Sequence, residues 1–319
     1  MNIEIKTETK IETKTEIKIL NYKGWINSIK ISNNKAELIV TTDIGPRIIK
    51  YSLLGKNNEF CEINSEVGAL DKEDFTMYGG HRLWHSPQIE PRNSQPDNDK
   101  VDYSINKNSV TVLQKVEKKT GLQKEMEIFL LDNSSKVKII HKIHNKNLWD
   151  IEFAAWSLSM MEKGGFEIIP INKEDTACLP NRIITYWPWT KQNDTRIFYG
   201  KNNIFVKQDV NRGIEFQDTL KIGTNNKEGW VAYINRGHVF IKTFKYEENE
   251  IYPDSGSSYE TFTNNFMLEL ETLSPLKKIK PNSYIEHIEE WDILENIGDF
   301  ILENGIEEDY IEYNIHLNK

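Results

Sequence analysis

Residues 36–53 read AELIVTTDIGPRIIKYSL, and they decide the fold class because they predict two β-strands joined by a short turn. Ala36–Thr42 and Arg47–Leu53 are rich in β-branched and other apolar residues, which favour extended backbone. Thr42–Arg47 contains Gly45-Pro46, a pair typical of turns. This stretch therefore predicts paired strands in a β-sheet.

The same pattern recurs along most of the chain. Further predicted strands are Val110–Val116, Glu125–Leu131, Lys136–His144, Ile151–Met160, Phe166–Pro170, Ile183–Trp187, Ile204–Gln208, Trp230–Asn235, His238–Lys245, Met267–Leu273 and Tyr284–Ile293. Turn residues at Asp132–Ser135, Asn225-Asn226 and Asn235–Gly237 are spaced as short hairpin connections would be. No amphipathic helix separates successive strands, so an alternating βαβ pattern is missing. We predict an all-β fold, a large and mainly antiparallel two-sheet sandwich.

The two ends of the chain differ from this pattern. Residues 1–19 alternate Ile or Thr with Lys or Glu, which fits either a low-complexity arm or an edge strand. Ile293–Glu303 has helical spacing and predicts a short C-terminal helix. Without a linker or a repeat, residues 20–319 are expected to form one domain, with Pro87–Lys100 as a long functional loop.

Composition excludes several classes of function. The net charge is −9, from 49 acidic and 40 basic residues, so no electrostatic footprint for nucleic acid is present. No stretch approaches the roughly 18–20 continuous apolar residues that span a bilayer. Cys61 and Cys178 are too few for a disulfide framework, and the N-terminus lacks the apolar core of a secretory signal. We expect a cytoplasmic protein with no nucleic-acid or membrane partner.

P-loop, dinucleotide-binding, nucleophile-elbow and paired C-x-x-C signatures are missing, so the first candidate for chemistry is Tyr78–Gln88, which we interpret as a loop. It offers His81, Arg82, Trp84 and His85 after two glycines, which together supply a titratable group, hydrogen-bond donors and a stacking face for a polyol. The alternatives are that both histidines bond backbone carbonyls and Trp84 packs in the core. Metal binding by His81 and His85 is a third interpretation, although no further ligand is evident.

Three more segments carry candidate binding residues. Arg47 follows a turn and is either exposed or holds a substrate hydroxyl or phosphate. Glu269 and Glu271 share one face of a predicted strand, as a general base or as a solvated face. The remaining candidates are the aromatic side chains Trp156 and Trp187, which either stack on sugar rings or pack in the core, and Asp254 in a polar turn.

Several of these segments together resemble a known family. The chain carries Gly45–Ile48, Gly79–His85, Ala154–Trp156 followed by Gly164-Gly165 and Ile168–Pro170, Trp187–Thr190, Tyr252–Asp254 and Glu269–Leu276. In this order, over about residues 20–293, they resemble a family of mutarotase-like proteins labelled as a domain of unknown function. The wider superfamily holds the aldose 1-epimerases and hexose-6-phosphate mutarotases. This resemblance implies a galactose mutarotase-like β-supersandwich with a sugar or sugar phosphate on one sheet, and no cofactor.

The resemblance also implies catalytic roles. In the superfamily a Glu in an L-E-T-Q segment takes the proton from the anomeric hydroxyl, and a His in a T-N-H segment protonates the ring oxygen. Leu270–Leu273 resembles the first segment, which makes Glu271 the candidate base. Trp156 stands where the second segment places its His, so either His81 or His85 is the acid or ordinary mutarotation is lost.

Three functional hypotheses follow from these residues. The first is an aldose 1-epimerase-like isomerase in which Arg47, Arg82 and Asp254 hold hydroxyls. The second is a carbohydrate-binding protein without turnover. The third is a metal-dependent enzyme built on His81 and His85. The sequence does not determine the oligomeric state.

Overall fold

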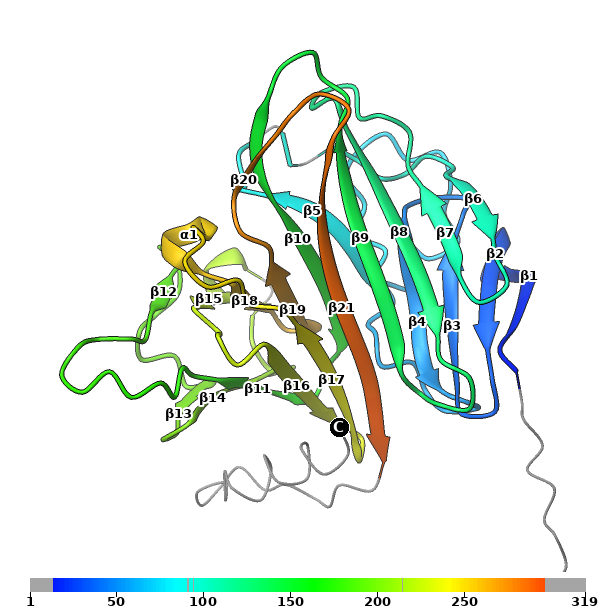
Figure 1. Cartoon of the computed structure of the whole chain (residues 1–319). Helices are drawn as coiled ribbons and strands as arrows, with labels where there is room; N and C mark the ends of the chain where they lie inside the picture. Colours follow the sequence, from blue (N-terminus) through cyan, green and yellow to red (C-terminus); the bar gives the residue numbers. More distant parts are fainter. Residues whose placement is uncertain (1–13, 91, 94, 214, 296–319) are drawn as a thin grey trace, which may run out of the picture.

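Two antiparallel sheets make up nearly all of the regular structure. The computed structural model describes residues 14–90, 92–93, 95–213 and 215–295. Figure 1 shows the two sheets, with the long strands β9, β10 and β21 near the middle of the molecule. Among the described residues, β10 packs against both β9 and β21, which belong to the other sheet. The sheets therefore face each other as the layers of a sandwich.

The first sheet has 11 strands. In spatial order they are β1 (Glu16–Tyr22), β2 (Trp25–Ser32), β3 (Ala36–Thr41), β4 (Arg47–Leu53), β5 (His81–Ser86), β10 (Ile151–Glu162), β19 (Met267–Leu273), β18 (Tyr259–Thr263), β15 (Leu220–Thr224) and β12 (Ile184–Tyr186), with β20 (Lys277–Ile279) paired to β10.

The second sheet has 10 strands. In spatial order they are β13 (Ile197–Tyr199), β14 (Asn203–Lys207), β11 (Phe166–Pro170), β16 (Trp230–Asn235), β17 (His238–Phe244), β21 (Tyr284–Glu295), β9 (Val137–Asn145), β8 (Leu122–Leu130), β7 (Val110–Leu113) and β6 (Asp102–Ile105). Two short helical turns complete the regular structure of the described residues, η1 (Phe216–Asp218) and α1 (Pro253–Gly256), the latter beside the β12 end of the first sheet (Figure 1).

The alternation of side chains along the strands builds the core. In β8 and β9 buried residues alternate strictly with partly exposed ones, as expected for strands with one face in the interior. Leu83 and Leu270 from the first sheet and Ile139, Phe240 and Trp291 from the second belong to one apolar cluster between the layers. Burial of this apolar surface is the main force that holds the two sheets together.

Most of the strand predictions are confirmed. Arg47–Leu53, Phe166–Pro170, Trp230–Asn235 and Met267–Leu273 are strands with those boundaries, and other predicted strands differ by a few residues at their ends. The hairpin at Asn235–Gly237 is also confirmed, because Arg236 and Gly237 both have positive φ, as the tight turn between β16 and β17 requires.

Of the predictions for the two chain ends, one is confirmed in part and the other is wrong in part. Residues 16–19 belong to the edge strand β1, as one of the two interpretations proposed, whereas residues 1–13 lie outside the described residues. The helix predicted from Ile293 is wrong for its first three residues, since β21 continues to Glu295. The cross-strand partners Val239 and Phe240 keep that end extended. Residues 296–319 lie outside the described part. Within that part, no helix has the length and apolar character needed to cross a membrane.

The interpretation of Tyr78–Gln88 as a loop is wrong for its central residues. His81–Ser86 form β5, an interior strand of the first sheet that pairs with β4 on one side and β10 on the other. Gly79 and Gly80 precede it with φ of +106° and +74°. These glycines turn the chain into the strand, and the strand then sends successive side chains to opposite faces.

Gly80 lets the turn before β5 lie against β4, so we expect its replacement by Ala to destabilise the fold. A Cβ atom at Gly80 would lie 2.4 Å from the carbonyl oxygen of Ile48 and 2.8 Å from Cα of Ile49. Gly237 has nearly the same φ, +77°, but open space around its Cβ position, which makes it a matched control. Gly237→Ala should cost about 1 kcal/mol, and Gly80→Ala roughly 2 kcal/mol more, in chemical denaturation. Equal costs would contradict the close packing.

Candidate functional site

The alternation in β5 separates two sets of candidate residues. Leu83 belongs to the core between the sheets, so its neighbours Arg82 and Trp84 point to the face of the first sheet that is turned away from the second sheet. We call this the site face. Trp84 lies opposite Trp156 of β10, and Arg82 lies opposite Leu158. Residues that are directly opposite in adjacent strands share a face.

The predicted carboxylates lie on the same face. Glu271 of β19 is directly opposite Leu158, and Glu269 is opposite Met160. Glu271 is also opposite Glu260 of β18, a residue that the sequence analysis did not select. The prediction that Glu269 and Glu271 point the same way is therefore confirmed, and the strands on each side of β19 extend the group.

Lys221 of β15 joins two of these carboxylates. Its ammonium nitrogen lies 2.7 Å from Glu271 Oε2 and 2.8 Å from Glu260 Oε2. The indole Nε1 of Trp156 donates a second hydrogen bond to Glu271 Oε2, at 2.9 Å. The Lys221 ammonium lies 4.6 Å from the ring centre of Trp156 and 4.8 Å from that of Trp187. Aromatic faces thus stabilise the cation that the carboxylates pair with.

A second ion pair lies beside the first. Arg82 Nη2 donates to Glu269 Oε1 at 3.1 Å, and the guanidinium carbon of Arg82 lies 4.2 Å from the ring centre of Trp84. The Trp84 ring in turn meets the Trp156 ring edge to face, with centroids 5.5 Å apart. The indole rings of Trp84 and Trp156 therefore lie between the Arg82–Glu269 pair and the Lys221–Glu271 pair, and each ring contacts one cation.

Burial shifts the proton affinities of these groups. It raises the pKa of Glu269 to about 7 against the opposing effect of Arg82, and it raises the pKa of Glu260 well above the ordinary value even though Lys221 opposes the shift. Burial alone would lower the pKa of Lys221, but Glu260 and Glu271 outweigh it and raise that pKa. These shifts favour a charged Lys221 and a protonated Glu260.

Several buried polar atoms on the site face have no partner among the described residues. These atoms are Oε1 of Glu260, Oε1 of Glu271, and Nε and Nη1 of Arg82. Glu271 is 0% exposed and Glu260 is 1% exposed. Leaving such atoms unpaired costs free energy, so their presence in one cluster is typical of a site that receives hydrogen bonds from a ligand.

Partly exposed residues border this cluster. Trp84, Trp187 and Asp254 each retain some exposure. Asp254, in α1, accepts a hydrogen bond from Ser86 Oγ at 3.3 Å, and its negative charge contributes to the raised pKa of Glu260. Of the predicted binding residues, the structure therefore brings Arg82, Trp84, Trp156, Trp187, Asp254 and Glu269 together around Glu271.

Arg47 lies on the same face, where its side chain bonds other parts of the protein. Its guanidinium is fully buried, bonds Asp97 Oδ2 at 2.6 Å, and donates from Nη1 to the carbonyls of Met77 and Gly79. Both terminal nitrogens are thus used inside the protein. The exposed alternative for Arg47 is wrong, because the buried side chain anchors the loops that cover this end of the sheet, whereas its contact with a ligand stays a prediction.

His85 points to the opposite face of the sheet from Glu271. It lies opposite Ala155, which belongs to the core between the sheets. Its side chain is 2% exposed, neither ring nitrogen has a partner among the described residues, and burial lowers its pKa to about 3. The expected pairing of His85 as acid with Glu271 as base is therefore wrong, because the two side chains leave the sheet on opposite faces.

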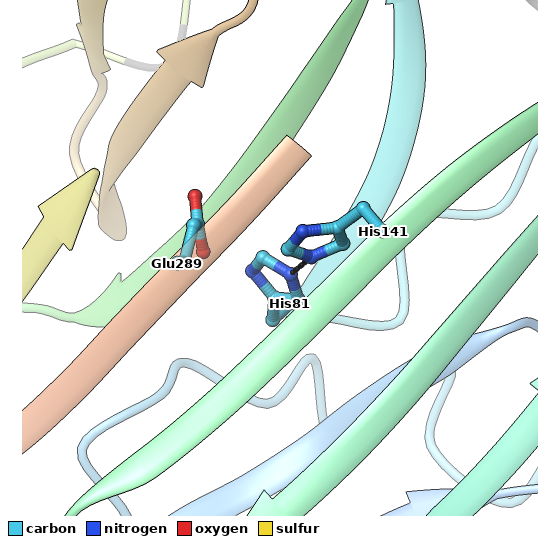
Figure 2. A group of neighbouring side chains, drawn as sticks. All are labelled: His81, His141 and Glu289. Carbon is cyan, nitrogen blue, oxygen red and sulfur yellow. Dashed lines mark hydrogen bonds between the residues drawn. The ribbon is translucent and has the colours of Figure 1, made fainter. Parts of the chain in front are cut away.

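His81 also faces the interior, where it forms a chain of hydrogen bonds. Nδ1 of His141 lies 3.0 Å from the carbonyl oxygen of His287 and must donate to it, so Nε2 of neutral His141 accepts. His81 then donates from Nε2 to His141 Nε2 at 2.8 Å and accepts at Nδ1 from Ser159 Oγ at 2.8 Å. Figure 2 shows the two rings meeting edge to edge beside Glu289. Burial lowers the pKa of both rings, which keeps them neutral.

Glu289 completes this interior network from β21. Lys242 lies 3.2 Å from its Oε1, the Trp291 indole donates to its Oε2 at 2.9 Å, and the hydroxyls of Ser157 and Thr272 bond it as well. These partners come from both sheets. The carboxylate is therefore neutralised and fully bonded within the protein.

The interior cluster does not fit a metal ion well. His81, His141 and Glu289 offer ligand atoms within 4.8 Å of one another, which is close enough for all three to reach one ion. Coordination would require His81 Nε2 to lose the proton that it donates to His141, and it would add a cation beside the Lys242 ammonium. The metal hypothesis for His81 and His85 is weakened further because His85 is not part of the cluster.

Lys221 and Glu260 are the site residues that sequence reasoning missed. Each lies in a short strand that was not predicted, β15 and β18. Leu220-Lys221-Ile222 has the apolar–polar–apolar alternation of a strand, which was the available signal. The distant pairing of β15, β18 and β19 has no local signature.

Comparison with known structures identifies the fold. No family model matches the chain. No curated protein matches it. A candidate aldose 1-epimerase from Klebsiella pneumoniae matches with a TM-score of 0.59 and 11% identity, over 88% of this chain and 83% of that one. The chain has the galactose mutarotase-like fold. A galactose mutarotase-like protein from Lactobacillus casei matches with a TM-score of 0.52 and 9% identity, over 84% and 100% of the two chains.

A galactose mutarotase related enzyme from Lactobacillus acidophilus gives a similar result, with a TM-score of 0.50 and 10% identity over 86% of this chain and 100% of that one. At identities this low, the likeness concerns the fold alone. The expected galactose mutarotase-like β-sandwich is confirmed, whereas the narrower family that the motifs resemble gains no support from the family models.

We expect His85→Leu to stabilise the protein, and to do so increasingly at low pH. The change removes two unpartnered buried nitrogens, which should raise the free energy of unfolding by about 1 kcal/mol at pH 8. Below pH 6.5, His85 binds a proton in the unfolded chain but not in the folded protein, where its pKa is about 3. His85 therefore lowers the free energy of unfolding as the pH falls. The gain should reach about 3 kcal/mol at pH 5 in denaturant titrations. His144→Gln, at a half-buried position paired with Glu125, is the control. A loss of stability in His85→Leu would contradict the assignment.

We also expect protein purified without chelator to carry no stoichiometric transition metal. The reason is that the His81–His141 hydrogen bond and the Lys242–Glu289 ion pair already satisfy the interior cluster. Elemental analysis of the full chain measures this. One equivalent of metal that is lost in His141→Gln would overturn our interpretation of the cluster.

Proposed function

We propose that this protein binds a sugar on the site face and interconverts its anomers. The observation that carries the proposal is the group of buried, unpartnered carboxylate and guanidinium atoms on Glu260, Glu271 and Arg82, bordered by indole rings. A sugar presents hydroxyls that satisfy such atoms and apolar ring faces that pack on aromatic side chains. The fold shared with mutarotase-like structures supports the same class of ligand.

The partly exposed residues define how the sugar approaches. Trp84 and Trp187 offer ring faces, and Asp254 offers a carboxylate for hydroxyl groups. Glu271 keeps Oε1 free while Lys221 and Trp156 hold Oε2. The carboxylate is thus fixed in position and still has one oxygen available to accept a proton, which is what a general base requires.

Glu260 is the proton donor in this proposal, in place of His81 and His85. Glu271 accepts the proton of the anomeric hydroxyl as Glu260 gives its proton to the ring oxygen, and the bond between C1 and the ring oxygen breaks to give the open-chain aldehyde. Ring closure on either face of the aldehyde reverses both transfers. Glu260 is suited to this role because burial raises its pKa, which favours the protonated form, and because it reaches the same ammonium as Glu271.

The total charge of Glu260 and Glu271 stays constant during the reaction, because one carboxylate gains a proton as the other loses one, and Lys221 contacts both. Before ring opening, Glu271 is ionised and Glu260 is protonated, and afterwards the two are exchanged. The ammonium lies within hydrogen-bond distance of both carboxylates, so it stabilises either arrangement without moving. We further propose that the reaction takes place in the cytoplasm, where the free thiols Cys61 and Cys178 remain reduced.

A second candidate function is sugar binding without turnover. The observation that favours it is Trp156, which occupies the strand beside Glu271 where the resemblance implies a histidine. An indole cannot act as a general acid. In that case Glu271→Gln should leave sugar affinity largely unchanged, and the unaltered protein should not accelerate anomer exchange.

We expect Glu271→Gln and Glu260→Gln each to reduce anomer exchange at least ~100-fold, since each removes one proton-transfer group. Exchange-transfer NMR with free and phosphorylated aldoses measures the rate. Glu286→Gln, at an exposed position of β21, is the control and should keep full activity.

The outcomes separate the assignments. Full activity in Glu260→Gln would remove Glu260 as the acid. No acceleration over buffer by the unaltered protein with any aldose would remove the catalytic proposal and leave the binding one.

A further inference from the structure

A polar hollow lies next to the site face. It has a volume of about 590 Å³, and the residues of its wall that matter here are Asp74, Phe75, Gln95, Asn98, Asp99 and Lys119. The Phe75 ring connects it to the site, because its centroid lies 5.5 Å from that of Trp84 and 5.4 Å from the guanidinium carbon of Arg82. The volume falls in the range of small-molecule sites.

The wall of the hollow is held in place by side chain to backbone hydrogen bonds. Asn98 donates from Nδ2 to the carbonyl oxygens of Lys72 and Asp74, at 2.9 and 2.7 Å. This joins the two loops that form the wall. Asn98 Oδ1 and Gln95 Oε1 are buried and have no partner among the described residues. Both amide oxygens can accept hydrogen bonds from hydroxyl groups.

The charge of the hollow argues against an anionic ligand. Glu73, Asp74 and Asp99 outnumber Lys72 and Lys119 along the wall. A phosphate would meet more acidic than basic groups there. Carboxylates, amides and one aromatic ring are instead the groups that hold a neutral polyol.

We infer that the hollow is a second sugar subsite, so that the ligand is a neutral di- or oligosaccharide. The inference rests on the proposed function, and it adds the class of substrate. In this arrangement the reducing-end ring lies over the Glu271 carboxylate, and the next ring extends along Trp84 and Phe75 into the hollow. The ring-to-ring contacts run from Phe75, in a loop, through Trp84 of β5 to Trp156 of β10, and this row of rings suits a ligand longer than one ring.

The test is calorimetric titration of the full chain with maltose, cellobiose and lactose, compared with glucose and galactose. At least one disaccharide should bind tenfold more tightly than its reducing-end monosaccharide. Gln95→Ala and Asp99→Ala, at two wall positions with no contact to the site face among the described residues, should each remove most of that difference while leaving monosaccharide affinity unchanged. Thermal unfolding of each variant verifies that it is folded.

Each outcome has one meaning. If monosaccharides bind and no disaccharide binds more tightly, the subsite is refuted and the proposed function stands. If a disaccharide binds more tightly but both variants retain the full difference, the second ring lies elsewhere and the subsite is again refuted. If no sugar produces heat, the proposed function fails and the subsite fails with it.

Discussion

The pleat of three adjacent strands determines what the site can contain. In β5, β10 and β19, successive side chains leave the sheet on opposite faces, so the residues next to Leu83, Ala155 and Leu270 in sequence must leave on the face away from the core. A cluster of conspicuous residues in the sequence is therefore divided in two. Arg82 and Trp84 meet Glu271 and its neighbours, while His81 and His85 enter the interior.

Charge balance explains how so many ionisable groups are buried on the site face. Arg82 and Glu269 lie within ion-pair distance of each other. Lys221 with Glu260 and Glu271 would carry a net negative charge if both carboxylates were ionised, and burial of a net charge is costly. One proton shared between the carboxylates makes the trio neutral, which agrees with the raised pKa of Glu260. The proton that the proposed chemistry needs is thus present because the site is buried.

The sequence predicted much of the architecture because strand signals are local. Runs of β-branched, aromatic and other apolar residues between turn residues identify strands such as Arg47–Leu53 and Trp230–Asn235 without knowledge of their partners. β5 was misread because its polar and aromatic residues are typical of binding loops, and its alternation was not weighed. Glu271 was found through a motif, whereas Lys221 and Glu260 lie in short strands whose role depends on pairing between distant segments, which the sequence does not show.

Trp156 stands where the resemblance implies a histidine, and this difference affects how a sugar would lie in the proposed site. Glu271 lies between β10 and β18, with Trp156 on one side and Glu260 on the other. A histidine at position 156 would protonate the ring oxygen from the β10 side. With Glu260 as the donor, the ring oxygen must lie toward β18 and the remainder of the ring toward β10, Trp156 and Trp84. That orientation directs the far end of the sugar toward Phe75, so the position of the acid and the position of a second ring follow from the same substitution.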